Sequence, residues 1–251
     1  MKDSFRFLTL NTWQERGPWQ ERWKLIFQEI PEIRPDIIVF QEVFNFQWMK
    51  EIKKQLAYPY AWYPEPSCGL LTVSKLPLEH SIYHAMKTKS PTEDYFRHFT
   101  MTTVNANGFR FLAMNTHLSW KLNEGSIRQG QVEEICQFTR QKPELPIVLA
   151  GDFNAASETE EVKCLLGQSL VDSFHQVNPG SRALTWDNRN PYAAGANHKL
   201  PDRRIDYVLY RQGSRSQLKP VLSEICFTKP NVEGVYPSDH FGVFTDFEYD
   251  V

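Results

Sequence analysis

The sequence predicts one α/β domain in which strands and helices pack as a sandwich. Strand-like and helix-like segments follow one another along the whole chain, and no change in composition divides it. A length of 251 residues is common for a single unit of this class. Hydrophobic residues make up 41% and charged residues 23%, a balance typical of a globular protein with a core of its own. We therefore expect residues 1–251 to form one domain.

The expected elements follow in order along the chain. Residues 5–11 alternate as a strand, and residues 18–33 carry apolar side chains near helical spacing, with Pro31 expected to kink that helix or end it early. The apolar run at 37–40 is typical of a buried strand. Later in the chain the patterns predict strands at 96–104, 109–115, 146–150, 204–210 and 241–247 and a helix at 127–139. Residues 178–202 show no clear period, which indicates a long loop at the rim of a site.

The charge pattern argues against a protein that follows a long nucleic-acid backbone. The formal net charge is −2 and the pI is about 6.4. Basic residues form only short pairs such as Lys53-Lys54 and Arg203-Arg204, whereas proteins that track a polyanion usually carry a basic face. We therefore expect local chemistry at a single phosphoester.

The cysteines and the apolar segments bear on the environment of the protein. The four cysteines are widely spaced and form no Cys-x-x-Cys pair, so we expect reduced thiols and no structural zinc site. The N-terminal residues lack the apolar core of a signal peptide. No apolar run approaches the roughly 20 residues of a membrane span. A cytoplasmic location is the expectation.

Polar side chains stand at the ends of several predicted strands. Carboxylate and amide oxygens of this kind suit Mg²⁺ or Mn²⁺ better than zinc. Imidazoles beside them supply groups that transfer protons or stabilise charge. Together such groups predict metal-assisted attack of water on phosphorus. The residues concerned are Asn11, Glu42, His117, Asp152, Asn154 and His240.

Six short motifs then identify a resemblance: LNTW at 10–13, QEV at 41–43, NTHL at 115–118, GDFN at 151–154, RRIDYVL at 203–209 and SDHFGV at 238–243. They resemble the successive motifs of the endonuclease/exonuclease/phosphatase superfamily, in the order of that family and over nearly the whole chain. GDFN or SDH alone would be a weak signal, but six motifs in order are specific. The resemblance implies a DNase I-like fold, a four-layer sandwich of two mixed β-sheets packed face to face with helices outside.

The resemblance also implies a role for each matching residue. Glu42 would be the principal ligand of Mg²⁺ or Mn²⁺, Asn11 would contact the metal or the phosphate, and Asp239 would lie in or next to the metal shell. Asp152 would orient or deprotonate the attacking water, and Asn154 would hold that water or a phosphate oxygen.

The histidines complete the implied set. His240 would bind or protonate a phosphate oxygen, with its ring positioned by Asp206, and His117 would stabilise charge on the transition state. Asp152 and His240 both remain candidates for the base.

One position departs from the pattern. Apurinic endonucleases and tyrosyl-DNA phosphodiesterases have an Asp two positions after the first-motif Asn, and this chain has Trp13 there. The departure favours a one-metal site.

Two further residues are candidates for substrate binding. Arg97 opens the predicted strand at 96–104, where it is expected to reach the phosphate. Trp186 lies in the long loop, and two interpretations of it stay open. An exposed indole would stack on a base, whereas a buried one would anchor the loop to the body.

The substrate remains open between two branches of the family. Trp186 and its neighbours ahead of RRIDYVLYR resemble tyrosyl-DNA phosphodiesterases, while the RIDYVLY run and the first motif without its Asp resemble neutral sphingomyelinases. We expect a phosphodiesterase that acts on nucleic-acid ends or nucleotides, with no obligate protein partner. A sphingomyelinase-type phospholipase C is the alternative, although the only hint of a membrane anchor is the loop at 119–126 with its lone Trp120. A catalytically inactive binding module is a third interpretation.

Overall fold

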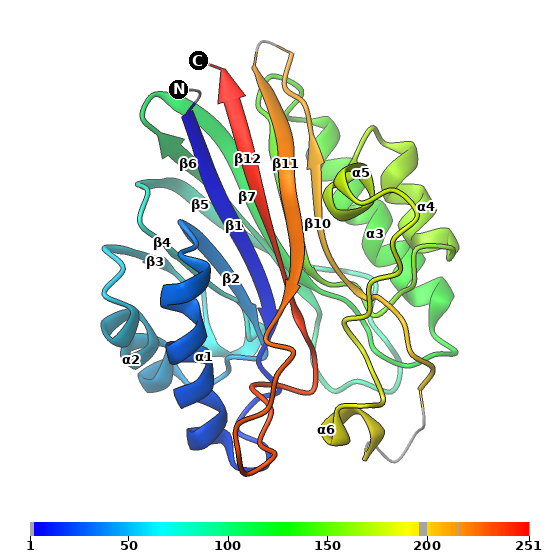
Figure 1. The fold of residues 1–251 in the computed structure, drawn as a ribbon. Coiled ribbons are helices and arrows are strands. Elements are labelled where there is room, and N and C mark those ends of the chain that lie inside the picture. The colour runs from blue at the N-terminus through cyan, green and yellow to red at the C-terminus, as the bar shows by residue number, and fades with distance from the viewer. Residues whose placement is uncertain (1–2, 196–199, 215, 251) are drawn as a thin grey trace.

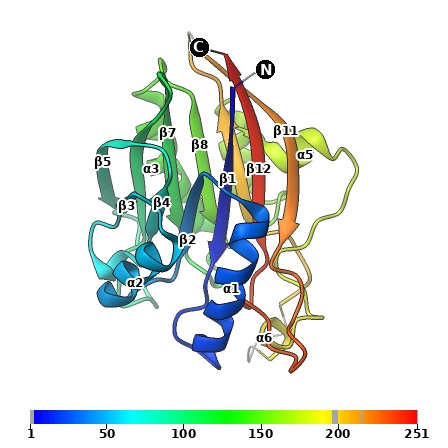
Figure 2. The same ribbon diagram turned by 60° about the vertical axis from the view of Figure 1, so that its left-hand side comes forward.

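Two six-stranded mixed β-sheets face each other in a computed structural model that describes residues 3–195, 200–214 and 216–250 (Figures 1 and 2). The first sheet has the order β11 (Gln217–Cys226), β12 (Gly242–Asp250), β1 (Asp3–Asn11), β2 (Ile37–Gln41), β4 (Leu71–Ser74), β3 (Tyr60–Trp62). The second has the order β5 (Leu78–Ala85), β6 (His98–Ala106), β7 (Phe109–His117), β8 (Ile147–Asp152), β10 (Asp206–Arg211), β9 (Val171–Asp172).

Helices cover the outer face of each sheet and complete the four layers that the family resemblance implies. On the first sheet lie α1 (Trp19–Ile33) and α2 (Phe46–Leu56), and on the second lie α3 (Gly125–Arg140) and α4 (Glu160–Gly167) (Figure 1). Two short helices, α5 (Ser173–Val177) and α6 (Pro191–Ala194), and the 3₁₀ turn η1 (Pro66–Cys68) belong to connections. The predicted fold class is confirmed.

Three apolar clusters correspond to the three interfaces between the layers. The cluster between the sheets includes Phe5 and Phe111, whose rings stack with centroids 4.5 Å apart. The cluster under α1 includes Trp23 and Ile26, and the cluster under α3 includes Val132 and Ile135. Each helix thus buries one apolar stripe, which is why its sequence shows helical spacing.

Several predicted boundaries move by a few residues. Pro31 does not end α1, which continues to Ile33 and stops at Arg34 in a left-handed conformation. A proline this close to the end removes a backbone hydrogen bond where few turns remain to be broken. Arg97 precedes β6 instead of opening it, and β10 begins at Asp206, not at 204.

The long loop at 178–202 is partly ordered by backbone pairing. It contains α6, and Trp186 forms an isolated antiparallel bridge with Arg203. Residues 196–199 of this loop lie outside the described part of the chain.

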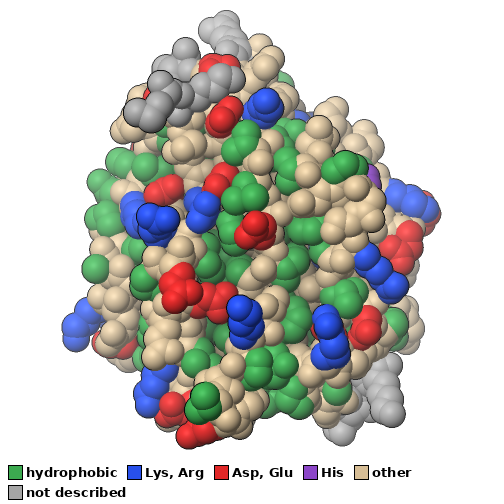
Figure 3. Space-filling view, viewed as in Figure 1, with side chains coloured by type: hydrophobic (Ala, Val, Ile, Leu, Met, Phe, Trp, Pro, Cys, Tyr) green, Lys and Arg blue, Asp and Glu red, His purple; other side chains and the backbone are tan. Residues whose placement is uncertain are grey.

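The surface charges and the cysteines can be compared with the sequence patterns. On the face shown in Figure 3, basic and acidic side chains are interspersed. All four cysteines are free thiols. Among the described residues, no helix has the length and apolar character needed to cross a bilayer.

Gly151 sets the spacing of two central strands just before the end of β8. It pairs with Thr116 of β7 and adopts φ +145°. A Cβ atom added at this position would lie 2.0 Å from the carbonyl oxygen of Thr116. Only glycine therefore allows β8 to approach β7 this closely beside Asp152.

We expect Gly151→Ala to lower the free energy of unfolding by at least about 1–3 kcal/mol, because overpacking adds to an unfavourable backbone angle. The matched control is Gly108→Ala, at φ +98° with no atom within 4 Å of the added carbon. Urea unfolding of both variants measures the difference. Equal losses would show that the close approach of the strands is not the constraint.

Candidate active site

A cavity of about 580 Å³ lies where strands of both sheets end. Nine of the ten predicted site residues line it: Asn11, Glu42, Arg97, His117, Asp152, Asn154, Trp186, Asp239 and His240. The tenth, Asp206, is fully buried behind His240. The cavity is therefore the candidate active site.

The register of the strands explains why these residues meet. In the first sheet, Asn11 pairs with Gln41, so β1 and the neighbouring Glu42 end together. In the second sheet, Asp152 pairs with His117 on one side and with Asp206 on the other. Because the two sheets face each other, the two groups converge at one end of the sandwich.

Asp152 is the centre of the hydrogen-bond network. Its Oδ2 accepts from the Asn11 side chain at 2.9 Å and from the Asn154 side chain at 3.2 Å, and its Oδ1 accepts from the Asn154 backbone at 2.8 Å. The Nε2 atoms of His117 and His240 lie 3.3 and 3.7 Å from Oδ2. Burial raises the pKa of Asp152 to about 6, and the Asp206 charge adds to the rise.

His240 is held by a second buried carboxylate. Its Nδ1 lies 2.9 Å from Asp206 Oδ2, as the family resemblance implies. Burial alone would lower the pKa of His240, but the carboxylates of Asp206, Asp152 and Asp239 outweigh it and hold the pKa well above its ordinary value. The ring is therefore an imidazolium at neutral pH.

His117 is in the opposite state. Burial, with the positive charges of Arg97 and His240, holds the pKa of His117 well below its ordinary value. Its ring is neutral at pH 7. The site thus places one charged and one neutral imidazole on either side of the same carboxylate.

Glu42 and Asp239 form an acidic pair at the cavity, and the positive charges of His240 and Arg22 offset the raised pKa of Asp239 only in part. Glu42 Oε2 is buried and accepts no hydrogen bond from the described residues, and the backbone of Glu42 is left-handed at φ +63°. Burial raises the pKa of Asp239 to about 7, and the Glu42 charge raises it further. A buried carboxylate oxygen without a hydrogen bond is costly, and here it lies near a second carboxyl group whose pKa is raised. A bound cation would relieve both, so this arrangement is typical of a cation-binding site.

Ligand atoms of Asp152, Asp206 and His240 lie within 4.8 Å of one another and form another possible cation set in the cavity. In that set, however, His240 and Asp206 already bind each other at 2.9 Å. The predicted ligands Glu42, Asp239 and Asn11 all line the cavity.

Arg97 forms part of the cavity wall, and Glu93 fixes its orientation. The Arg97 Nε and Nη2 atoms donate to Glu93 at 2.9 and 2.7 Å, and both residues are buried. Ser119 also donates to Glu93, at 3.0 Å. The guanidinium is thus held rigidly beside the site.

Trp186 lines the cavity, but the structure corrects the interpretation that it is exposed. Only 6% of the residue is accessible, and it packs in a small cluster with Ala193 and Ile205. Its ring meets His240 edge-on, with centroids 5.1 Å apart. Burial favours the alternative in which Trp186 anchors the loop, because a stacking platform needs an open face.

Two features of the site were not expected from the sequence. Arg22 is fully buried and donates to the backbone carbonyls of Thr12, Trp13 and Gln14, which fixes the loop after Asn11. The spacing of apolar residues in a helix does not show whether an arginine is buried or exposed to solvent.

The second feature is an aromatic rim, in which Trp13 stacks on Tyr192 with centroids 4.7 Å apart. At the position where two branches of the family have an Asp, this chain therefore has an aromatic ring.

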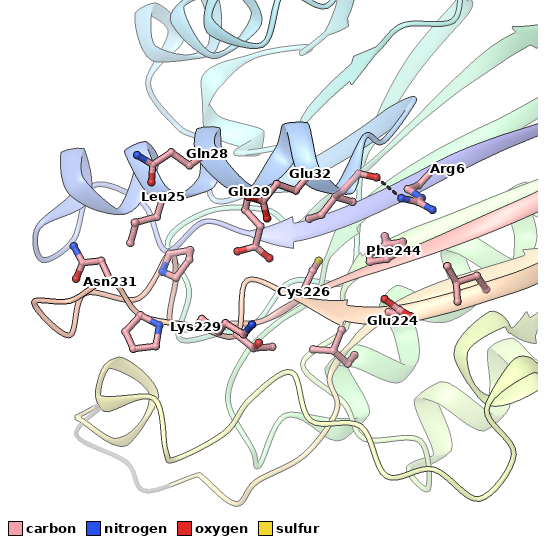
Figure 4. A pocket seen from close by; sticks show the side chains of 16 residues that line it. Arg6, Leu25, Gln28, Glu29, Glu32, Glu224, Cys226, Lys229, Asn231 and Phe244 are labelled. Carbon is pink, nitrogen blue, oxygen red and sulfur yellow. Dashed lines mark hydrogen bonds between the residues drawn. The ribbon is translucent and has the colours of Figure 1, made fainter.

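Another groove, also about 580 Å³, runs between α1 and the end of β11 (Figure 4). Glu29, Glu32 and Glu224 line it, and none of the predicted site residues does. It is therefore separate from the candidate active site.

Comparison with known proteins agrees with this geometry. The family model described as "Endonuclease/Exonuclease/phosphatase family" matches residues 8–240. Nocturnin of Drosophila melanogaster is 24% identical over 94% of this chain and 43% of its own length. Sphingomyelinase C of Leptospira interrogans is 27% identical over 61% of this chain and 28% of its own, so the chain spans less than half of either relative. The crystal structure of D. rerio TDP2 with a single-strand DNA product has the same fold, with a TM-score of 0.80 and 19% identity over 98% of this chain and 99% of that one.

We expect Trp186→Ala to destabilise the fold by about 3–5 kcal/mol, as truncation of a buried aromatic does, and to impair all substrates alike. Thermal melts and assays on a large and a small phosphodiester measure both effects. Tyr83→Ala is the control, since 46% of Tyr83 is accessible and it does not line the cavity. A stable Trp186→Ala protein that loses binding of the large substrate only would restore the stacking interpretation.

Proposed function

Because this chain belongs to the endonuclease/exonuclease/phosphatase family, we propose that it is a divalent-metal-dependent phosphodiesterase that acts on nucleic-acid ends or nucleotides. One observation carries the reaction class. Glu42 and Asp239 face a cavity in which Glu42 Oε2 has no partner among the described residues, beside the Asp152 and His240 network. An acidic pair next to a held base and an imidazolium suits hydrolysis of a phosphoester.

The metal would be held by Glu42 and Asp239, with the Asn11 side chain beside them. All are oxygen donors, which suit Mg²⁺ or Mn²⁺. Trp13 supplies a ring where related enzymes have a carboxylate, so we propose one cation. When bound, this ion supplies a positive charge that stabilises the oxygens of the phosphoester.

Asp152 is the proposed base. With a pKa of about 6 it is mainly ionised at pH 7, and hydrogen bonds from Asn11 and Asn154 fix its orientation. We prefer Asp152 to His240 as the base, because the Asp206 carboxylate holds the pKa of His240 well above its ordinary value and so favours the protonated ring. A carboxylate held in this way can orient a water molecule and take its proton.

The two imidazoles then act on the phosphate. His240, as an imidazolium, donates a hydrogen bond and stabilises negative charge on a phosphate oxygen. His117, kept neutral by its surroundings, donates one N–H without placing a second full charge on the site. Arg97 adds a fixed positive charge to the wall.

The aromatic rim favours a nucleic-acid end or nucleotide. Trp13, Tyr95, Trp120 and Tyr192 line the cavity around the polar centre. Tyr95 and Trp120 are 41% and 38% accessible. Stacking on aromatic faces contributes about 1–3 kcal/mol per base and tolerates any sequence. The proposal therefore assigns the base to the rim and the phosphoester to the centre.

A second candidate, a sphingomyelinase-type phospholipase C, rests on a different observation. Trp120 and Leu122 are exposed on the loop before α3, with Leu122 52% accessible. Exposed apolar side chains beside a catalytic cavity are one way to meet a lipid surface.

We expect EDTA to abolish phosphodiesterase activity and Mg²⁺ or Mn²⁺ to restore it. Glu42→Gln keeps the shape of the side chain and removes its charge, so kcat should fall by at least about 10², and calorimetric titration should show weakened Mg²⁺ binding. Glu32→Gln, in the separate groove, is the matched control and should behave as the wild type. Full activity in EDTA on protein free of metal would exclude the mechanism.

A substrate panel distinguishes the two candidates. We expect cleavage of short single-stranded oligonucleotides or nucleotides, with KM about ten-fold higher or more after Tyr192→Ala if stacking contributes as stated. A small generic diester should be hydrolysed equally by both proteins. Cleavage of sphingomyelin in mixed micelles, with no reaction on oligonucleotides, would replace the first candidate by the second.

A further inference from the structure

A second group of metal-binding side chains lies outside the catalytic cavity, where the connection from β3 to β4 meets the start of β6. Glu65, Cys68 and His98 each place one ligand atom within 4.8 Å of the others. Cys68 and His98 are 8% and 7% accessible, and the Glu65 side chain is 45% accessible. None of the three lines the active-site cavity.

We propose that Glu65, Cys68 and His98 bind a structural cation of the Zn²⁺ class, which fastens the first sheet to the second beside the catalytic cavity. Glu65 and Cys68 belong to a connection in the first sheet, whereas His98 is the first residue of a strand in the second.

The distances between the ligand atoms fit one tetrahedral ion. Glu65 Oε1 lies 3.8 Å from Cys68 Sγ and 3.9 Å from His98 Nε2. Ligands at ordinary zinc bond lengths in a tetrahedron are about 3.3–3.6 Å apart. Side-chain movements of about half an ångström would bring both Glu65 distances into this range, and the Cys68 and His98 ligand atoms lie within 4.8 Å of each other. The accessible side at Glu65 admits a water molecule as the fourth ligand.

The chemistry of the three groups selects the cation. A thiolate with an imidazole favours Zn²⁺ or Co²⁺ over Mg²⁺, in contrast to the all-oxygen set at Glu42. The buried Nδ1 of His98 has no hydrogen-bond partner among the described residues. Binding of the cation would release the proton of the Cys68 thiol to solvent.

The local backbone holds two of the ligands in place before any ion arrives. Glu65 precedes the 3₁₀ turn that contains Cys68, and Gly69 closes this turn at φ +63°. The ring of Phe44 occupies the space where a side chain at 69 would be, since its nearest atom would lie 2.5 Å from a Cβ added there. Spacing of three residues on such a turn directs Glu65 and Cys68 to the same side.

The bound cation would not touch the substrate. It would affect catalysis by fixing the positions of the segments that carry Glu42 and Arg97. The carbonyl of Gly69 accepts a hydrogen bond from the backbone of Val43, the residue after Glu42, at 3.0 Å. On the other side, His98 follows Arg97, whose guanidinium lines the cavity. One cation between these segments would limit how far the Glu42 loop moves from the Arg97 wall.

No zinc site was expected from the sequence because the chain contains no Cys-x-x-Cys pair. This set instead has one residue of each kind and draws its histidine from 30 positions away along the chain, a separation that only the sheet packing closes.

The test uses the full chain, stripped of metal and titrated with Co²⁺. Wild type should show a sulfur-to-cobalt charge-transfer band in the near ultraviolet, and Zn²⁺ should compete it away. Cys68→Ser should lose the band, and Cys164→Ser, the matched control at a partly exposed cysteine, should keep it. Glu42→Gln should also keep it, which separates this site from the catalytic one. Absence of the band in wild type, or its persistence in Cys68→Ser, would overturn the proposal.

Glu65→Gln provides a second test in case Cys68→Ser does not fold. The Glu65 side chain is partly exposed, so its replacement should not disturb the core. We expect it to fold normally and to bind Co²⁺ at least about ten-fold more weakly, since changes even outside the first ligand shell cost that much. In a Glu42→Gln background, Zn²⁺ should raise the melting temperature of the protein that keeps Glu65, and the rise should be smaller when Glu65→Gln is added. Equal affinity and equal melting shifts in the two proteins would contradict Glu65 as a ligand.

Discussion

The hydrogen bond between Asn11 and Asp152 is the contact on which the rest of the site depends. It joins the end of β1 in the first sheet to the end of β8 in the second, at 2.9 Å, with both residues buried. A buried carboxylate is costly unless it is hydrogen-bonded, so Asp152 also requires Asn154 and the neighbouring imidazoles. A second bridge between the sheets, from Gln41 to Asn115 at 2.7 Å, supports the same end of the sandwich. The hydrogen bonds of one buried carboxylate therefore join the two sheets at the end of the sandwich where the site lies, beyond the apolar cluster that packs them together.

Local patterns predicted an α/β sandwich with polar residues at strand ends, and the family resemblance implied its four layers. Asp152 comes directly after an apolar run, and His240 directly precedes the last predicted strand, so both were readable from the local sequence. What could not be read was whatever depends on distant segments meeting. Burial of Arg22 under loop carbonyls, closure of Trp186 over His240, and the ring of Trp13 against Tyr192 all arise from the tertiary structure. Periodicity carries no information on such contacts, because the partners share no fixed spacing.

The candidate active site has a polar centre and a surrounding rim of loops. This division explains why resemblance to a family predicts the type of reaction more readily than the substrate. The centre is formed by strand ends, whose positions the sheets determine. The rim is formed by connections, including the segment with α6 and the loop that carries Trp120. Connections tolerate change at little cost to the core, so related chains with the same sheets can differ in what they bind.

Glu42 and Asn154 both hold left-handed backbone angles, at φ +63° and +50°. Such angles are unfavourable for most side chains, and glycine or asparagine adopts them more easily. At Glu42 the residue that the proposed metal site needs is therefore not the one that the backbone prefers. Selection for thermal stability alone would tend to replace Glu42 and so damage the proposed active site. Selection for catalytic turnover would keep Glu42 despite its unfavourable backbone angle. At Asn154 there is no such conflict, because asparagine adopts the left-handed backbone easily and its amide also suits the proposed role. The two positions should therefore differ in how often substitutions are accepted during evolution.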